Sequence, residues 1–280
     1  MPSRTVNLPI RRVDQPPAIP PRPIDGQKGL FGRVLIVGGS HEMIGAPAMA
    51  ATSALRMGSG LVQIAVPETI LAAVLSIIPE AIGLALGKKP DLQRLLEAAG
   101  RANVIAIGPG LGQSATVARR IQALLNLEKP MVVDADALNY LATIKRWPKF
   151  SGVLTPHPGE MHRLTKTTVP TDDRGRIDLA TKFAAHHKKV LVLKGHRTVV
   201  TDGHRVYVNT TGDSSLSKAG SGDVLTGMVA SLIGQKMDLF EAACLAVHLH
   251  GKAGELAGKK LGRRCVLARD VIDSISPLLR

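Results

Sequence analysis

The stretch KAGSGDVLTG, residues 218–227, places closely spaced glycines directly ahead of an apolar segment. If that segment is a helix, its first backbone N–H groups and the positive end of its dipole form a site for an anion such as phosphate. Glycines let the anion approach the backbone closely. Asp223 could remove the proton from a hydroxyl that attacks the bound phosphate, or it could only cap the helix. The stretch alone leaves both interpretations open.

The chain ahead of this stretch alternates between strand and helix patterns. Strands are predicted at residues 33–37, 61–66, 103–107, 131–133, 153–155 and 190–193. Helical patterns lie between them, at 47–57, 70–78 and 116–125 and in segments that begin near Asp136, Pro158 and Asp178. This alternation is typical of an α/β fold in three layers, in which helices cover both faces of a mostly parallel sheet.

The pattern changes near residue 197. Two β-rich runs, 197–201 and 205–209, meet at Asp202-Gly203, which predicts an antiparallel hairpin at one edge of the sheet. Helices are predicted again at 223–233, 239–256 and 269–279. Residues 1–28 contain PPAIPPRP and no apolar period, so we expect an extended Pro-rich arm followed by one domain, residues 29–280.

Polar or Gly-rich clusters directly follow five of the predicted strands. The clusters are Gly38–Ser40, Gly108–Gly112, Asp134–Asp136, Thr155–Glu160 and Lys194–Gly195. Ligands of open parallel sheets bind beyond the carboxyl ends of the strands, so the clusters predict a long cleft for a dinucleotide or for two ligands. The sequence contains no GxxxxGK[ST], and neither Gly cluster fits GxGxxG with its downstream acid. Both a P-loop and a standard Rossmann site are therefore excluded.

The composition is that of a folded protein, with 45% apolar and 21% charged residues. Its net charge of +14 would attract nucleic acid, a membrane surface or a phosphorylated small molecule. The basic pairs are scattered and aromatic residues make up only 2%, which argues against a nucleic-acid site.

Membrane and export signals are missing from the sequence as read. No apolar run reaches the ~20 residues that cross a bilayer, and no apolar segment of a secretory signal follows the basic N-terminus. Cys244 and Cys265 form no CxxC pattern. We expect a cytoplasmic protein with reduced thiols and no membrane contact.

Six motifs together resemble one family. They are residues 32–67 (GRVLIVGGSHEMIGAPAMAATSALRMGSGLVQIAVP), IGPGLG at 107–112, VVDADALN at 132–139, LTPHPGEMHRL at 154–164, VLKG at 192–195 and AGSGDVLTG at 219–227. In this order and spacing they resemble the NAD(P)H-hydrate dehydratases of the ribokinase-like superfamily. The resemblance covers about residues 28–276 and implies the ribokinase-like fold.

The resemblance implies repair of a damaged nicotinamide cofactor. NADHX or NADPHX, hydrated at the nicotinamide ring, would be dehydrated to NADH or NADPH at the expense of ADP or ATP. The family implies that Asp223 deprotonates the ring hydroxyl, that Mg²⁺ bridges the nucleotide phosphates and that phosphate leaves. It further implies a homotetramer and, because residues 1–28 are too short for the epimerase domain often fused ahead, an NAD(P)HX epimerase on a separate chain.

The family motifs also imply individual contacts. Positions that hold the hydrated cofactor correspond to Ala46, Gly110, His157 and Asp223. Positions that hold the adenine nucleotide correspond to Lys194, Gly195, His196, Arg197, Thr198 and Gly222. The N–H groups that hold the transferred phosphoryl group correspond to Ala219, Gly220, Ser221 and Gly222. One departure is Asp213, where relatives commonly have Asn, which adds a negative charge near the phosphates.

Several alternatives stay beside this interpretation. A kinase for a small hydroxymethyl compound, such as a thiamine precursor, would use the same GxGD aspartate, and a basic nucleic-acid-associated protein is a more distant rival. His157 and His162 lack the spacing of a zinc helix, so we expect no certain metal ligand. His248 and His250 are assigned to packing or solvation. Asp134 and Asp136 are left open between Mg²⁺ or water organisation and a structural role.

Overall fold

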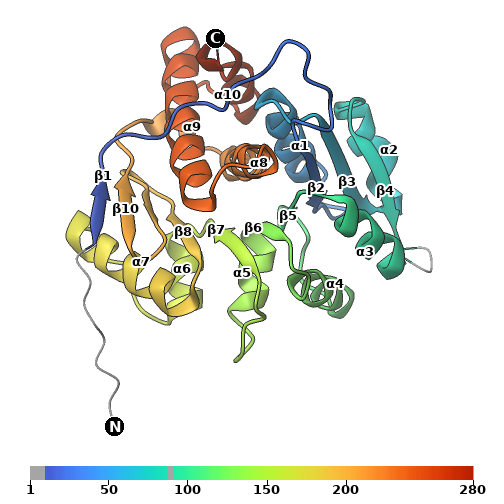
Figure 1. The fold of residues 1–280 in the computed structure, drawn as a ribbon, viewed down its shortest axis with the longest axis horizontal. Coiled ribbons are helices and arrows are strands. Elements are labelled where there is room, and N and C mark those ends of the chain that lie inside the picture. Colours follow the sequence, from blue (N-terminus) through green and yellow to red (C-terminus); the bar gives the residue numbers. More distant parts are fainter. Residues whose placement is uncertain (1–9, 88–90, 280) are drawn as a thin grey trace.

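The computed structural model describes residues 10–87 and 91–279, which form a ten-stranded sheet between two layers of helices (Figure 1). The strand order is β1-β10-β9-β8-β7-β6-β5-β2-β3-β4. Neighbouring strands are parallel except at β9, which is antiparallel to both β8 and β10. The strands are β1 Arg11–Val13, β2 Arg33–Val37, β3 Leu61–Pro67, β4 Ile82–Leu86, β5 Val104–Ile107, β6 Pro130–Val133, β7 Ser151–Leu154, β8 Val190–Leu193, β9 Val199–Thr201 and β10 Arg205–Val208.

Helices cover both faces of the sheet. The helices are α1 Gly45–Arg56, α2 Glu68–Ile77, α3 Asp91–Arg101, α4 Ala115–Leu125, α5 Ala135–Leu141, α6 Pro158–Thr165, α7 Asp173–His187, α8 Ser221–Gly234, α9 Leu239–Leu261 and α10 Ala268–Asp273. One face carries α1, α2, α8, α9 and α10, and the other carries α3 to α7 (Figure 1). The expected three-layer fold with a mostly parallel sheet is confirmed.

Each central strand feeds two hydrophobic cores, because side chains alternate between the faces of a sheet. In β2, Val34 and Ile36 join the core under α1 and α8, whereas Leu35 and Val37 join the core under α3 to α5. All four side chains are fully buried. This burial on both faces explains why the strands read as continuous apolar runs.

Helix α8 lies against α1 at the centre of its layer (Figure 1). A Cβ on Gly227 would lie 1.9 Å from the carbonyl oxygen of Ala50, so only glycine permits this approach. Of the 14 residues of α8, 12 are buried. The start of α8, which carries Asp223, is therefore held rigidly over the carboxyl ends of the strands.

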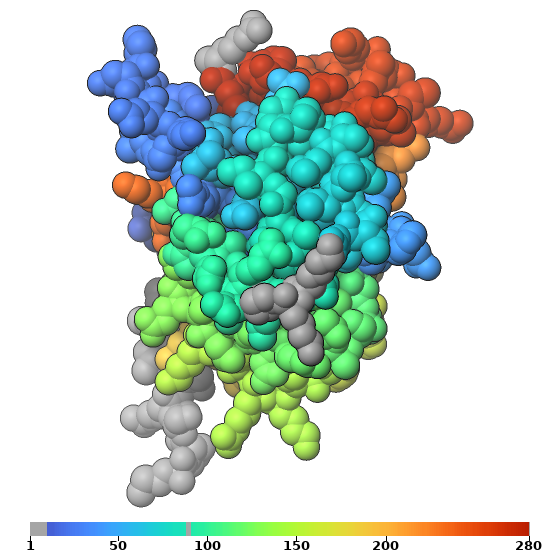
Figure 2. Space-filling model, turned by 90° about the vertical axis from the view of Figure 1, so that its right-hand side faces the viewer, coloured from blue at the N-terminus to red at the C-terminus, as the bar shows by residue number. Residues whose placement is uncertain are grey.

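The sheet is wider than the sequence predicts. The hairpin of β9 and β10 is confirmed, but Arg11–Val13, from the expected arm, pairs in parallel with β10 and forms the outermost strand. At the other end, β4 and α3 are absent from the sequence prediction, and the segment from α2 to α3 lies at the centre of the face shown in Figure 2. Helix α7 begins at Asp173 rather than near Asp178, and the last predicted helix ends at Asp273. Within the described ranges no helix is long and apolar enough to span a membrane.

Candidate active site

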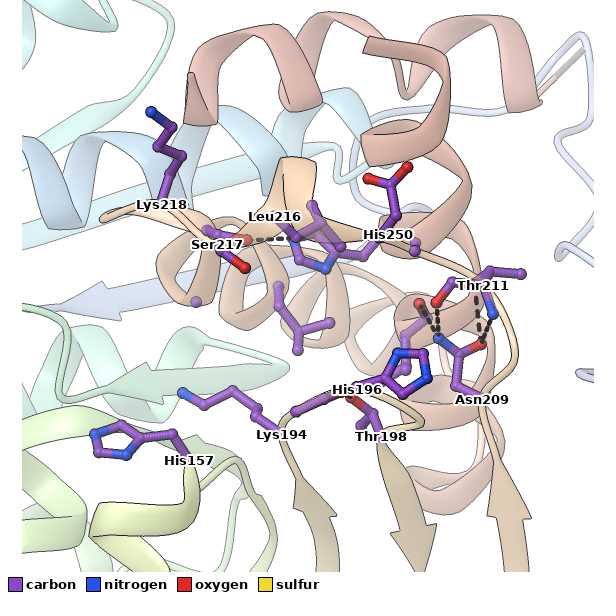
Figure 3. A pocket seen from close by; sticks show the side chains of 18 of the residues that line it. His157, Lys194, His196, Thr198, Asn209, Thr211, Leu216, Ser217, Lys218 and His250 are labelled. Carbon is purple, nitrogen blue, oxygen red and sulfur yellow. Dashed lines mark hydrogen bonds between the residues drawn. The ribbon is translucent and has the colours of Figure 1, made fainter. Parts of the chain in front are cut away.

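A cleft of about 990 Å³ opens at the carboxyl ends of β6, β7 and β8, against the start of α8 (Figure 3). This is the edge at which the polar clusters of the sequence predict a ligand site. The lining residues include Asp134, His157, Lys194, Gly195, His196, Arg197, Thr198, Gly220, Ser221, Gly222 and Asp223, with Asn209, Thr211, Val247 and His250 from β10, the following loop and α9. The cleft thus joins segments that lie far apart in the sequence.

The loop that leads into α8, residues 218–222 (hereafter the anion loop), presents backbone N–H groups to the cleft. Gly220 begins the helix with φ +89°, and a Cβ there would lie 2.4 Å from the sulfur of Met49. The N–H of Ser221 donates to the carbonyl of Lys218 at 3.3 Å. Within the described chain the N–H groups of Ala219, Gly220 and Gly222 donate no hydrogen bond, so they are free for an anion.

Asp223 is the third residue of α8 and lines the cleft. Gly220 is the capping residue, and the Asp223 carboxylate accepts no hydrogen bond from the described residues, so the capping interpretation is wrong. Burial, followed by the charge of Asp134, raises the pKa of Asp223 to about 7, although Lys194 opposes the shift. A carboxylate that titrates near neutral pH is suited to accept a proton from a substrate.

A partly buried ion pair lies beside Asp223. The Lys194 ammonium contacts Asp134 Oδ1 at 2.9 Å and Glu160 Oε2 at 3.8 Å. The second oxygen of Asp134 accepts the Thr226 hydroxyl at 2.8 Å, which ties β6 to α8. Burial alone would lower the pKa of Lys194, but the two carboxylates outweigh it and the pKa is raised, so the lysine stays charged.

Gly222 stands directly over this pair. A Cβ at position 222 would lie 3.3 Å from the Lys194 nitrogen and 3.9 Å from Asp134 Oδ2. Any side chain there would enter the space between the anion loop and the ion pair. The glycine therefore keeps open the part of the cleft in which a phosphate could meet both the N–H groups and Lys194.

The loop after β8, residues 194–198, is shaped by a residue that the sequence analysis missed. The buried guanidinium of Arg176, on α7, donates to the carbonyls of Leu193 and Arg197 at 3.3 Å, to that of Lys194 at 3.4 Å and to that of His196. Gly195 has φ +140°, and a Cβ at this position would lie 3.1 Å from a guanidinium nitrogen of Arg176. Four carbonyls are thus held by one cation, which fixes the segment expected to bind the nucleotide.

His157 lies at the start of α6 and lines the cleft (Figure 3). Its Nδ1 accepts the N–H groups of Gly159 and Glu160 at 3.0 and 3.4 Å, while the Glu160 carboxylate accepts the N–H of His157 at 2.8 Å. Burial, followed by the charge of Lys194, lowers the pKa of His157, which keeps the ring neutral. No group of three or more His, Cys, Asp or Glu that could hold a metal occurs among the residues that the structure describes.

Ala46 and Gly110 do not line this cleft, but they lie together at the same edge of the sheet. A Cβ on Gly110 would be 3.1 Å from the Cβ of Ala46. The loop that carries Gly110 abuts the end of β6, because a Cβ on Gly108 would be 1.7 Å from the carbonyl oxygen of Asp134. The structure thus brings His157 and Asp223 together in the cleft and places Ala46 beside Gly110 at the ends of β2 and β5.

The two aspartates of DADALN play different roles. Asp134 belongs to the partly buried ion pair, whereas Asp136 Oδ2 accepts the N–H of Gly112 at 2.8 Å and does not line the cleft. Asp136 therefore has the structural role that the sequence left open. Asp213, the departure noted in the sequence, does line the cleft, but its carboxylate accepts Arg263 Nε at 2.7 Å. The pair carries no net charge.

His250 is expected from the sequence only to pack or to be solvated, but in the structure it also lines the cleft. It is buried in the wall of the cleft, and its Nε2 lies 3.2 Å from the Ser221 hydroxyl. His248, two residues earlier, is not a lining residue and contacts the Tyr207 hydroxyl at 3.4 Å instead. Nearby, the Asn209 side chain donates to the Thr211 carbonyl at 2.9 Å (Figure 3). No local motif signals these residues, because the fold alone brings α9 and β10 to the anion loop.

Comparison with known families decides the assignment. The family model described as NAD(P)H-hydrate dehydratase matches residues 34–277. The chain belongs to the NAD(P)H-hydrate dehydratase family. This confirms the resemblance seen in the six motifs of the sequence.

Curated relatives of this family include enzymes of two lengths. The ADP-dependent (S)-NAD(P)H-hydrate dehydratase of Bacillus subtilis is 36% identical over 91% of this chain and 91% of its own length. The Bifunctional NAD(P)H-hydrate repair enzyme Nnr of Moorella thermoacetica is 43% identical over 94% of this chain but only 52% of its own length. The chain thus spans about half the length of the bifunctional dehydratase relatives that it matches.

Solved structures of the dehydratase family share the fold. The ADP/ATP-dependent NAD(P)H-hydrate dehydratase of Bacillus subtilis, co-crystallised with ATP and Mg²⁺, superposes with a TM-score of 0.81 at 31% identity, over 93% of this chain and 92% of that one. A hydroxyethylthiazole kinase of Pyrococcus horikoshii superposes with a TM-score of 0.64 at 14% identity, which shows the fold alone. The expected ribokinase-like fold is confirmed.

Proposed function

We propose that this chain catalyses the dehydration of hydrated NADH or NADPH, coupled to hydrolysis of ADP or ATP. The observation that carries the proposal is the meeting of Asp223 with the free N–H groups of the anion loop in one cleft. A base next to a phosphate cradle is what phosphorylation of a hydroxyl requires. Family membership supplies the hydrated nicotinamide ring as the carrier of that hydroxyl.

The reaction needs a base because hydroxide is a poor leaving group and phosphate is a good one. Asp223 accepts the proton of the ring hydroxyl as its oxygen attacks the terminal phosphorus of the nucleotide, and the shorter nucleotide leaves. The N–H groups of Ala219, Gly220 and Gly222 stabilise the charge on the transferred phosphoryl group. The lone pair of the ring nitrogen then forms a double bond to the carbon that carries the phosphate, and the C–O bond breaks with release of phosphate. Loss of a proton from the neighbouring ring carbon restores the dihydropyridine.

The substrates would lie side by side along the sheet edge. Residues 194–198 and Gly222 would hold the adenine nucleotide, and the loop fixed by Arg176 supports this placement. His157 and Asp223 would contact the hydrated nicotinamide, which extends toward Ala46 and Gly110. A cleft of about 990 Å³, at the upper end of the range for small-molecule sites, has room for more than one ligand group.

Magnesium fits the cleft as an ion that arrives with the nucleotide. Mg²⁺ commonly binds one or two carboxylates together with substrate phosphates and water, without a dedicated protein cage. Asp134 lines the cleft and offers carboxylate oxygens beside Lys194, and the described residues hold no group of three or more His, Cys, Asp or Glu that could form such a cage. When bound, the ion would neutralise phosphate charge.

The activity is tested with prepared NADHX and NADPHX, by following the absorbance of the restored dihydropyridine with ADP and with ATP. We expect turnover that depends on the nucleotide, and the Asp223→Asn variant provides the matched control without the base. Stable phosphorylation of a hydroxymethyl compound without dihydropyridine formation would favour the kinase alternative. Salt-dependent retention on DNA without any nucleotide turnover would favour the nucleic-acid alternative.

The proposal has three further features. We expect a homotetramer, cytoplasmic location and cooperation with an NAD(P)HX epimerase. The cooperation follows from stereochemistry, because a base fixed on one side of the cleft accepts one epimer of the hydrated ring. Size-exclusion chromatography with light scattering measures the tetramer, and addition of an epimerase should allow complete conversion of a mixture of epimers.

A further inference from the structure

Ser221 and His250 form a buried polar pair against the anion loop. The Ser221 hydroxyl lies 3.2 Å from His250 Nε2, and each residue is 7% exposed. Both line the cleft, and Figure 3 shows His250 beside the segment that carries Leu216 and Ser217. The reaction described above uses neither side chain.

The backbone of Ser221 is already committed. Its N–H donates to the carbonyl of Lys218, so only its side chain is left to contact a phosphoryl group. A hydroxyl has one hydrogen to donate. If the hydroxyl gives that hydrogen to His250, it turns only lone pairs toward the anion, whereas a hydroxyl that accepts from His250 keeps its hydrogen for the anion.

The surroundings of His250 keep its ring neutral. Burial lowers the pKa of His250 to about 4, a hydrogen bond to the Ser221 backbone opposes this shift, and the Lys194 charge adds to it. A neutral imidazole carries one N–H and can place it on either nitrogen. With the proton on Nε2, the ring donates to Ser221, and an anion in the loop stabilises this arrangement.

We propose that His250 is a positioning residue that donates from Nε2 to the Ser221 hydroxyl, so that Ser221 donates its own hydrogen to the transferred phosphoryl group. Ser221 thereby replaces with its side chain the donor that its backbone lacks. The inference rests on the proposed function for its substrates and concerns only the phosphoryl-binding half of the cleft. Any ligand that carries a terminal phosphoryl group would make the same contact.

The test compares Ser221→Ala, His250→Leu, His250→Gln and the double variant Ser221→Ala/His250→Leu. We expect Ser221→Ala to lower kcat about tenfold to a hundredfold, as loss of one hydrogen bond to a charged group does, with little change in KM for the hydrated cofactor. His250→Leu should lower kcat about tenfold. His250→Gln, whose amide N–H lies near the position of Nε2, should recover activity to within about threefold of the unmodified protein. The double variant should lose no more than Ser221→Ala.

Control measurements separate this role from a merely structural one. His248→Leu, on the same helix but outside the cleft, should leave kcat unchanged. All variants should keep a cooperative melting transition. Three results would overturn the inference: a rise in KM instead of a fall in kcat, additive losses of activity in the double variant, or no loss of activity in Ser221→Ala.

A second measurement does not depend on the hydrated cofactor. Vanadate imitates the transferred phosphoryl group when it binds with Mg²⁺ and the nucleotide that leaves, which is AMP for ADP as the donor and ADP for ATP as the donor. Binding of each of these two mixtures is measured, and the one that matches the donor should weaken about tenfold in Ser221→Ala and His250→Leu but not in His248→Leu. Suppose that the unmodified protein binds one of the mixtures, with weaker binding in Ser221→Ala and His250→Leu only, and yet fails to turn over NADHX. In that case the proposed function fails and the inference stands. Equal binding by all variants would refute the inference even if NADHX is turned over.

Discussion

Replacing Asp134 by Asn should move the pH dependence of turnover toward acid. Asp134 is one of the charges that raise the pKa of Asp223 to about 7, and Asn keeps the shape of the side chain while removing its charge. At roughly 6–8 Å, two unit charges interact by about 2–3 kcal/mol at an effective dielectric constant of about 20. Lys194, at 2.9 Å from Asp134, cancels part of this effect.

We therefore expect the pKa of Asp223 to fall by about one unit, equivalent to about 1.4 kcal/mol. Asp223 must be ionised to accept a proton, so activity rises with pH as the carboxyl loses its proton. At pH 6 the unmodified protein should reach about a tenth of its own plateau rate and the variant about half. The assay follows dihydropyridine absorbance from pH 5.5 to 9 at saturating substrates, with rates normalised to each protein's plateau.

Asp136→Asn is the matched control, because Asp136 bonds to Gly112 outside the cleft. Its profile should coincide with that of the unmodified protein. The partly buried Lys194 loses its nearest partner in Asp134→Asn, so that variant should also be less stable, by roughly 1–3 kcal/mol. If the acidic side of the pH profile of Asp134→Asn stays in place or moves toward alkaline pH, either result would refute the assignment of that part of the profile to the titration of Asp223.

Four other predictions concern the same cleft. Asp223→Asn should lower kcat at least a hundredfold and raise the melting temperature, since it removes both the base and a buried charge; a loss below about tenfold in the dihydropyridine assay contradicts the base assignment. Gly222→Val should weaken ADP binding at least tenfold in calorimetry because its side chain meets Lys194. Arg176→Met should raise KM for the nucleotide more than KM for NADHX, and equal effects on both would count against a role of Arg176 in holding the nucleotide loop. Asp213→Asn frees Arg263 and should lower KM for ADP about twofold to threefold at low salt, with the difference vanishing at high salt.

The sequence predicts those parts of the fold and site that follow from local pattern. Continuous apolar runs and helical repeats define most strands and helices, and each polar cluster after a strand lies at the predicted edge of the sheet. What depends on pairing between distant segments escapes this reasoning. The strand Arg11–Val13 forms only because β10 offers it an edge, and a three-residue run carries no period of its own.

The same limit applies to the residues that support the site. Arg176 reads as one more basic residue in a helix, yet it binds carbonyls of a loop that follows the next strand. His250 reads as part of an apolar helix and becomes a cleft residue only where α9 crosses the anion loop. The side chains proposed to contact substrate stand in recognisable motifs, whereas side chains that hold those motifs in place can be identified only once the packing is known.

The charge balance of the cleft differs from that of the whole chain. The chain carries +14, but beside the anion loop the carboxylates of Asp134, Glu160 and Asp223 surround the ammonium of Lys194, while Arg197, Lys218 and Arg263 line other parts of the cleft. These three carboxylates would repel the negative charge of a nucleotide phosphate beside the anion loop. Three arrangements counter the repulsion: Asp223 titrates near neutral pH, neutral N–H groups line the anion loop, and Mg²⁺ can accompany the phosphates. In the proposed reaction the same negative charges would favour catalysis, because Asp134 and Glu160 raise the pKa of Asp223 and so make its carboxylate a better acceptor for the hydroxyl proton.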